Sequence, residues 1–181
     1  MEQPIHIAPY SPAWVGEFRH AAERLRARLE NTAIRIDHIG STAIVGVPAK
    51  PVIDIQVSVV SFQSMDSLQI QMEKAGFVWR RDNPELTKRY FREQSGSPRT
   101  HVHVRQHGSW HEQWALLFRD YMRMHPEEHS PYAELKHRLA AHFGSDRQGY
   151  TDAKDDHFWS VIRRADRWAA RIGWQPDQSD A

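Results

Sequence analysis

The run from Val52 to Val60 constrains the fold more than any other part of the chain. It reads Val-Ile-Asp-Ile-Gln-Val-Ser-Val-Val, and because side chains alternate across a strand, one face is aliphatic and the other carries Asp54, Gln56 and Ser58. Two prolines lie shortly before it, the second being Pro51, and they keep the preceding loop out of helical geometry. The pattern predicts a β-strand with a carboxylate near its start.

The segments around this strand predict a sheet with helices packed against it. A helix is expected from Ser11, its N-cap, to about Leu29, because apolar residues recur there at spacings of three and four. A strand over residues 34–39 follows and ends at Gly40. A helix over 65–75 and strands over 77–81, 87–93 and 99–106 are expected next, each bounded by glycine or proline.

The last third of the chain has a helical pattern, from residue 109 to about 172. Ser109 and Glu112 form a capping pair at its start, a second helix is expected over 130–144, and Thr151 is the expected cap of the last helix. The tail beyond Trp174 is expected to be frayed. Strands followed by helices indicate the α+β class, and a chain of 181 residues suits one domain, 1–181.

Composition narrows the classes of function. The chain has no cysteine, which excludes disulfides, zinc-thiolate sites and thiol nucleophiles, so a metal would be held by oxygen or imidazole. The beginning of the sequence lacks the pattern of a signal peptide, and no stretch has the ~20 apolar residues of a membrane span. We expect a soluble, cytoplasmic protein. A net charge of +1 does not favour a nucleic-acid partner.

Two polar features lie at the ends of the predicted strands around residues 40–54. The turn Gly40-Ser41-Thr42 offers backbone N–H groups and two hydroxyls to a phosphate, although such a tripeptide is also common in ordinary turns and helix caps. Asp54 must lie in a solvated cleft or be paired, because burying a lone carboxylate is costly. It suits a magnesium ligand, or alternatively an ion-pair partner of Lys50 or an arginine.

Two histidines share one face of the last predicted strand. His101 and His103 alternate with valines in Thr-His-Val-His-Val-Arg, so both imidazoles leave the same side. Such a pair can ligate a metal, relay a proton or bind phosphate, and the alternative is a polar sheet face with ordinary hydrogen bonds. Basic residues surround these features and suit a phosphate-rich ligand or, alternatively, a solvated strand edge: Lys50, Lys88, Arg89, Arg92, Arg99 and Arg105.

A strand, Gly-Ser, about ten residues and a strand of the form Asp-hydrophobic resembles the signature of the nucleotidyltransferase fold of polymerase beta-like enzymes. Two segments of this region are similar to sequences of the GrpB family: His-Ile-Gly-Ser-Thr-Ala at 38–43 and Lys-Pro-Val-Ile-Asp-Ile at 50–55. The likeness covers nearly the whole chain, and further matching positions are Trp14, Phe18, His101 to Val104, Phe118 to Tyr121, Tyr132, Leu135, Lys136, Tyr150 and Lys154.

The resemblance implies a mixed nucleotidyltransferase-like sheet that binds a nucleoside triphosphate and a divalent metal. Asp54 and His103 would be the catalytic residues, and Asp54, His101 and His103 the metal ligands. The phosphate-binding residues would be Gly40, Ser41, Thr42, Lys50 and Arg92. The metal would be magnesium or manganese, with zinc an option because imidazole favours it. The acceptor would be a small molecule, an RNA or a protein.

One position departs from the wider superfamily. Where those enzymes carry a second carboxylate after Asp54, this chain has Gln56, a poor metal ligand that leaves the usual two-metal arrangement incomplete. The alternative hypothesis is therefore a catalytically silent nucleotide- or coenzyme-A-related binding or folding-accessory module, as the fusion of relatives to dephospho-CoA kinase suggests. RNA binding through the basic sheet edge is a third reading.

Overall fold

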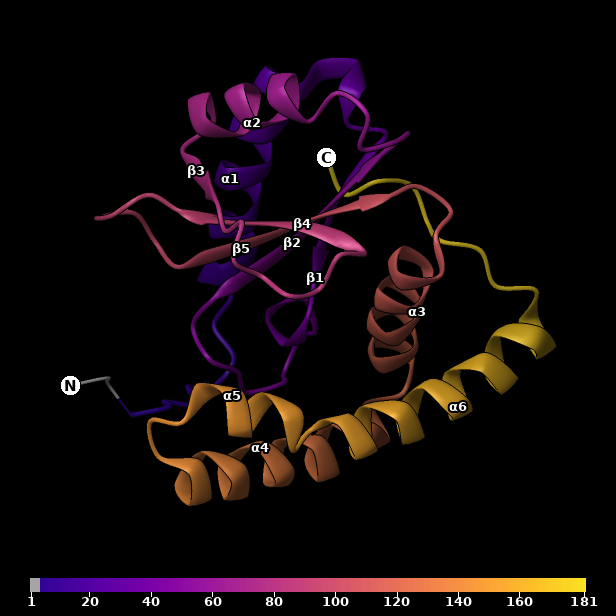
Figure 1. Ribbon diagram of the computed structural model, residues 1–181. Helices are drawn as coiled ribbons and strands as arrows, with labels where there is room; N and C mark the ends of the chain where they lie inside the picture. Colours follow the sequence, from indigo (N-terminus) through magenta and orange to yellow (C-terminus); the bar gives the residue numbers. More distant parts are fainter. Residues whose placement is uncertain (1–3) are drawn as a thin grey trace.

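The computed structural model describes residues 4–181, and a five-stranded mixed sheet forms its centre (Figure 1). The strands are β1 (Arg35–Ile39), β2 (Ile53–Val59), β3 (Phe77–Trp79), β4 (Lys88–Glu93) and β5 (Thr100–Gln106). Their order across the sheet is β1-β2-β5-β4-β3. Strands β2 and β5 are parallel, and the other neighbouring pairs are antiparallel. The expected α+β class is confirmed.

Helices cover both faces of the sheet. Helices α1 (Ala13–Leu29) and α2 (Met65–Lys74) lie together on one face, and α3 (Trp110–Met124) lies on the other (Figure 1). Helices α4 (His129–Phe143), α5 (Arg147–Asp152) and α6 (Asp155–Ile172) gather below the sheet in this view. Single turns of 3-10 helix occupy Glu30–Thr32, Ser41–Ala43 and Pro126–Glu128. In residues 4–181, no helix has the length and apolarity needed to cross a membrane.

The alternation of β2 decides how the layers pack. Its aliphatic side chains Ile53, Ile55, Val57 and Val59 are each at most 2% exposed and join α1 and α2 in the main hydrophobic cluster. The opposite face is also buried at Gln56, because α3 covers it and the Glu112 carbonyl accepts a hydrogen bond from Gln56 Nε2 at 3.2 Å. Only Asp54, near the start of the strand, is left partly exposed on that face.

Most elements begin and end close to their predicted bounds, but several local predictions are wrong. Pro12, and not Ser11, is the N-cap of α1, and Ser11 Oγ accepts from the backbone N–H of Ala13 at 3.3 Å. Thr151 does not cap the last helix: it lies inside α5, where its hydroxyl donates to the Arg147 carbonyl at 2.9 Å, and Lys154 precedes α6. The capping of α3 is confirmed, since Ser109 Oγ accepts from the backbone N–H of Glu112 at 3.4 Å.

The segment after α6 is ordered along the free edge of β1, contrary to the expected frayed tail. Ser179 Oγ accepts from the backbone N–H of Ile36 at 2.8 Å, and Asp180 Oδ2 accepts from that of His38 at 2.9 Å. Buried Arg119 also donates to Asp180, at 3.0 Å. Unpaired N–H groups of an edge strand need partners, and side chains of the tail supply them here.

Candidate functional site

The parallel pairing of β2 and β5 brings the carboxylate and the two imidazoles together. Asp54 pairs with His101 in the register, and His103 lies two residues further along β5 on the same face. Asp54 Oδ1 lies 3.3 Å from His101 Nδ1 and 3.4 Å from His103 Nε2. All three ligand atoms lie within 4.8 Å of one another. The three residues predicted from separate segments therefore form one cluster.

The charge states of this cluster suit a cation. Burial raises the pKa of Asp54, but hydrogen bonds from His101 and His103 outweigh it and hold that pKa well below its usual range. Burial lowers the pKa of His103, which is only partly offset by Asp54. An ionised carboxylate and a neutral imidazole are the forms that bind metal ions.

The donor set of one carboxylate and two imidazoles fits a divalent transition metal such as manganese or zinc better than magnesium. The second ring nitrogen of His101, Nε2, is buried without a hydrogen-bond partner among the described residues. A metal-bound imidazole usually donates a hydrogen bond from that second nitrogen, which orients the ring, so His101 lacks this orienting hydrogen bond among the described residues. The site would need water or substrate oxygens to complete the coordination.

Gly40 holds the turn against this cluster. Its φ is 71°, which favours glycine, and a Cβ at this position would come within 2.8 Å of Asp54 Oδ2. Only a residue without a side chain lets the turn approach the carboxylate so closely. The glycine of the Gly-Ser motif is thus a steric requirement of the site.

The two hydroxyls of the turn have different surroundings. Ser41 Oγ donates to the Tyr132 hydroxyl at 3.2 Å and lines the open space beside Asp54. Thr42 is buried; its hydroxyl donates to the Val52 carbonyl at 3.4 Å and lies 3.0 Å from His38 Nε2. Thr42 therefore braces the turn, while Ser41 faces the site.

Two cavities meet at Asp54. The first, of about 390 Å³, is lined by Lys50, Lys88, Lys136 and Lys154 together with Asp54, His101 and His103. The second, of about 330 Å³, has four aromatic residues in its lining, Trp114, Phe118, Tyr132 and Phe158, together with Asp155. Both include Ser41, Asp54, His103, Thr151 and Lys154. A ligand at Asp54 can thus extend into a cationic half and an aromatic half.

The predicted phosphate-binding cations differ in their placement. Lys50 lines the cationic cavity. Arg92 lies on β4 opposite His101, but its guanidinium pairs with Glu93 at 3.2 Å and lines a different cavity, beside Arg80 and Asp82. The register places Arg92 on the same face as His101, but Arg92 does not line either cavity at Asp54, and its phosphate role stays a prediction.

Two lysines of the site were not among the predicted site residues. Lys136 on α4 is 2% exposed, and burial lowers its pKa to about 7. Lys154 precedes α6, and burial, together with Lys50, lowers its pKa to about 8 although Asp54 opposes this. Their helices are far from β2 in the sequence. The available signal was a lysine on the buried face of a helix, four residues after Tyr132.

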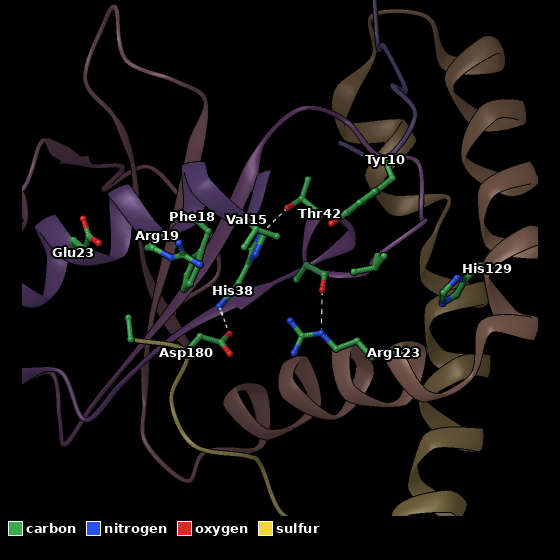
Figure 2. A pocket seen from close by; sticks show the side chains of 13 residues that line it. Tyr10, Val15, Phe18, Arg19, Glu23, His38, Thr42, Arg123, His129 and Asp180 are labelled. Atoms are coloured by element: carbon green, nitrogen blue, oxygen red, sulfur yellow. Dashed lines mark hydrogen bonds between the residues drawn. The ribbon is translucent and has the colours of Figure 1, made fainter. Parts of the chain in front are cut away.

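A cavity of about 440 Å³, larger than either cavity at Asp54, lies on the other side of the turn and is not lined by Asp54 (Figure 2). His38 stacks on Phe18 there, with ring centroids 4.7 Å apart, and burial lowers its pKa to about 4. Arg123 reaches across from α3 and donates to the Ala43 carbonyl at 3.0 Å. These contacts stabilise the turn on the side that faces away from Asp54.

Comparison with known sequences identifies related proteins. A family model described as GrpB protein matches residues 4–164. The UPF0157 protein PA4798 of Pseudomonas aeruginosa is 36% identical over 89% of this chain and 67% of its own length. A dephospho-CoA kinase of Mycolicibacterium paratuberculosis is 30% identical over 96% of this chain but only 49% of its own length. The chain thus spans about half of that relative.

Solved structures give the same result. The conserved protein GrpB from Enterococcus faecalis superposes with a TM-score of 0.81 at 30% identity, covering 90% of this chain and 99% of that one. The Cid1 poly(U) polymerase bound to MgATP superposes with a TM-score of 0.51 at 13% identity, covering 76% and 44%. The second likeness concerns the fold alone. This chain belongs to the GrpB family, and its fold is similar to that of the nucleotidyltransferases.

Proposed function

We propose that this protein binds a nucleoside triphosphate together with a divalent cation at Asp54 and transfers the nucleoside monophosphate to an acceptor. The observation that carries the proposal is the cluster of Asp54, His101 and His103 directly beside the Gly40–Ser41 turn. The nucleotidyltransferase-like fold and the two cavities that meet at this cluster support it. Neither the cluster nor the lining of the two cavities includes Arg92.

Each residue has a defined part in the proposed reaction. Asp54, His101 and His103 would hold the cation, which when bound would neutralise charge on phosphate oxygens. Ser41 would donate its hydroxyl to a phosphate oxygen, exchanging its bond with Tyr132. An acceptor oxygen would form a bond to the α-phosphorus while the bond between the α-phosphorus and the oxygen that bridges it to the β-phosphate breaks. Pyrophosphate would leave with that bridging oxygen, and the proton of the acceptor would pass to solvent. Binding in this geometry supplies orientation.

The test is titration calorimetry of ATP with manganese against three proteins: wild type, Asp54→Asn and Asp166→Asn. Asp166 is an exposed carboxylate of α6 and serves as the matched control. We expect the manganese-dependent binding to be lost in Asp54→Asn and kept in Asp166→Asn. Equal binding by all three proteins would refute the proposal.

One observation favours a binding module without turnover as the second candidate. Gln56, at the position of a second carboxylate, is fully buried and bonded to the Glu112 carbonyl of α3. Its Nε2 is engaged by that bond, and its Oε1, which is buried without a hydrogen-bond partner among the described residues, offers a cation only a neutral oxygen in place of a carboxylate. The name of the dephospho-CoA kinase relative adds coenzyme A as a ligand to try. Transfer of labelled nucleotide to any component of a cell extract would favour the enzyme, and binding without transfer would favour the module.

A further inference from the structure

Three lysines from separate elements face one cavity beside Asp54. Lys50 lies in the loop before β2, Lys136 in α4 and Lys154 just before α6. The ammonium groups of Lys50 and Lys154 each lie 4.7 Å from the centroid of the Tyr150 ring, so the two charges are within twice that distance of each other. The ammonium of Lys136 lies 4.2 Å from the Tyr132 ring centroid.

These three cations have no carboxylate partner. In residues 4–181, no carboxylate oxygen lies within salt-bridge distance of Lys50, Lys136 or Lys154, whereas Lys88 of the same cavity pairs with Glu85 at 2.7 Å. Lys136 donates to the Pro48 carbonyl. Lysine is rarely buried unless its charge is paired. Three uncompensated lysines around an open cavity therefore indicate a site shaped for an anion.

The number and spread of these charges indicate the class of anion. A single phosphate group would leave most of a cavity of about 390 Å³ empty, whereas a chain of linked phosphates fills more of it and offers oxygens to lysines on three different elements. Asp54 is the only carboxylate among the residues that line this cavity. The aromatic cavity on the other side of Asp54 suits a nucleobase, because aromatic rings stack on bases.

We propose that Lys50, Lys136 and Lys154 form a polyphosphate subsite that binds the two terminal phosphates of a nucleoside triphosphate. The base then lies against Trp114 and Phe158, and the α-phosphate lies at Asp54, where the two cavities meet. This inference rests on the proposed function for the identity of the whole ligand, but the lysine subsite itself is tested with inorganic tripolyphosphate.

The test compares wild type with Lys136→Met, Lys154→Met and the control Lys74→Met, whose lysine is exposed at the end of α2. Methionine keeps most of the length of the unbranched side chain and removes its charge. Thermal unfolding checks that each variant is folded. Titration with tripolyphosphate, without metal, measures the subsite directly.

We expect tripolyphosphate to bind wild type and Lys74→Met equally, and Lys136→Met and Lys154→Met about ten- to a hundredfold more weakly, because each loses a charge-assisted hydrogen bond. Adenosine binding should be the same in wild type, Lys74→Met and Lys136→Met, because neither of these two lysines lines the aromatic cavity. Equal tripolyphosphate affinities would overturn the subsite. Failure of the proposed function would appear elsewhere: manganese-dependent ATP binding unchanged in Asp54→Asn, with tripolyphosphate binding still dependent on Lys154.

Discussion

Replacing Gly40 by alanine tests whether the turn and the carboxylate form one unit. Alanine at a φ of 71° is strained, which costs about 1–3 kcal/mol. Its Cβ would also lie 2.8 Å from Asp54 Oδ2, so the turn or the carboxylate must move. We expect unfolding free energy to fall by that amount and manganese affinity to fall with it, as measured by urea denaturation and calorimetry.

Gly46 provides the matched control. Its φ is also positive, at 83°, but a Cβ there would meet nothing within 4 Å. Gly46→Ala therefore carries the backbone strain without the crowding of Asp54, and we expect it to lose stability while keeping wild-type manganese affinity. The difference between the two variants isolates the contact with Asp54. A manganese affinity in Gly40→Ala equal to that of wild type would show that the turn and the carboxylate do not act as one unit.

Three further predictions concern charge. Tripolyphosphate binding should weaken as the pH rises from about 7 to about 9, because Lys136 and Lys154, with pKa values of about 7 and about 8, lose their protons. Calorimetry across that pH range measures the affinity, and an affinity that does not change with pH would contradict the prediction. Arg119→Met should cost about 3–5 kcal/mol in urea denaturation, because it removes the guanidinium that lies 2.7 Å from the buried Asp120 and leaves that carboxylate with Arg123 at 3.9 Å and the Trp174 ring N–H at 3.2 Å. The pKa of His38 is lowered to about 4, so on acidification the unfolded chain binds this proton before the folded protein does. The free energy of unfolding should therefore fall by up to about 3 kcal/mol as the pH drops from about 6.5 to about 4. His38→Phe should reduce this pH dependence in urea denaturation, and an unchanged dependence would contradict the prediction.

Local periodicity was enough to predict the elements that carry the site. The alternation of β2 placed Asp54 opposite the aliphatic face, and that of β5 placed His101 and His103 together. These patterns are properties of short segments, so they can be read without knowing the rest of the fold. The proximity of β2 and β5 is different, because parallel pairing and its register depend on long-range packing.

The parts that sequence reasoning missed are held by contacts between distant segments. Lys136 and Lys154 reach the site only because α4 and α6 pack at the end of the sheet. The order of the tail depends on Ser179 and Asp180 meeting unpaired N–H groups of β1. Lys136 carries one weak local signal, its place on the buried face of a helix four residues after Tyr132, whereas nothing in the sequence around Asp180 indicates its contact with β1.

A crystal grown with ATP and manganese, and measured at the manganese absorption edge, tests the proposed site most directly. We expect an anomalous peak within coordination distance of Asp54, His101 and His103, with density for phosphates running from Ser41 towards Lys154. A nucleotide bound elsewhere, or a manganese ion held by other residues, would contradict it.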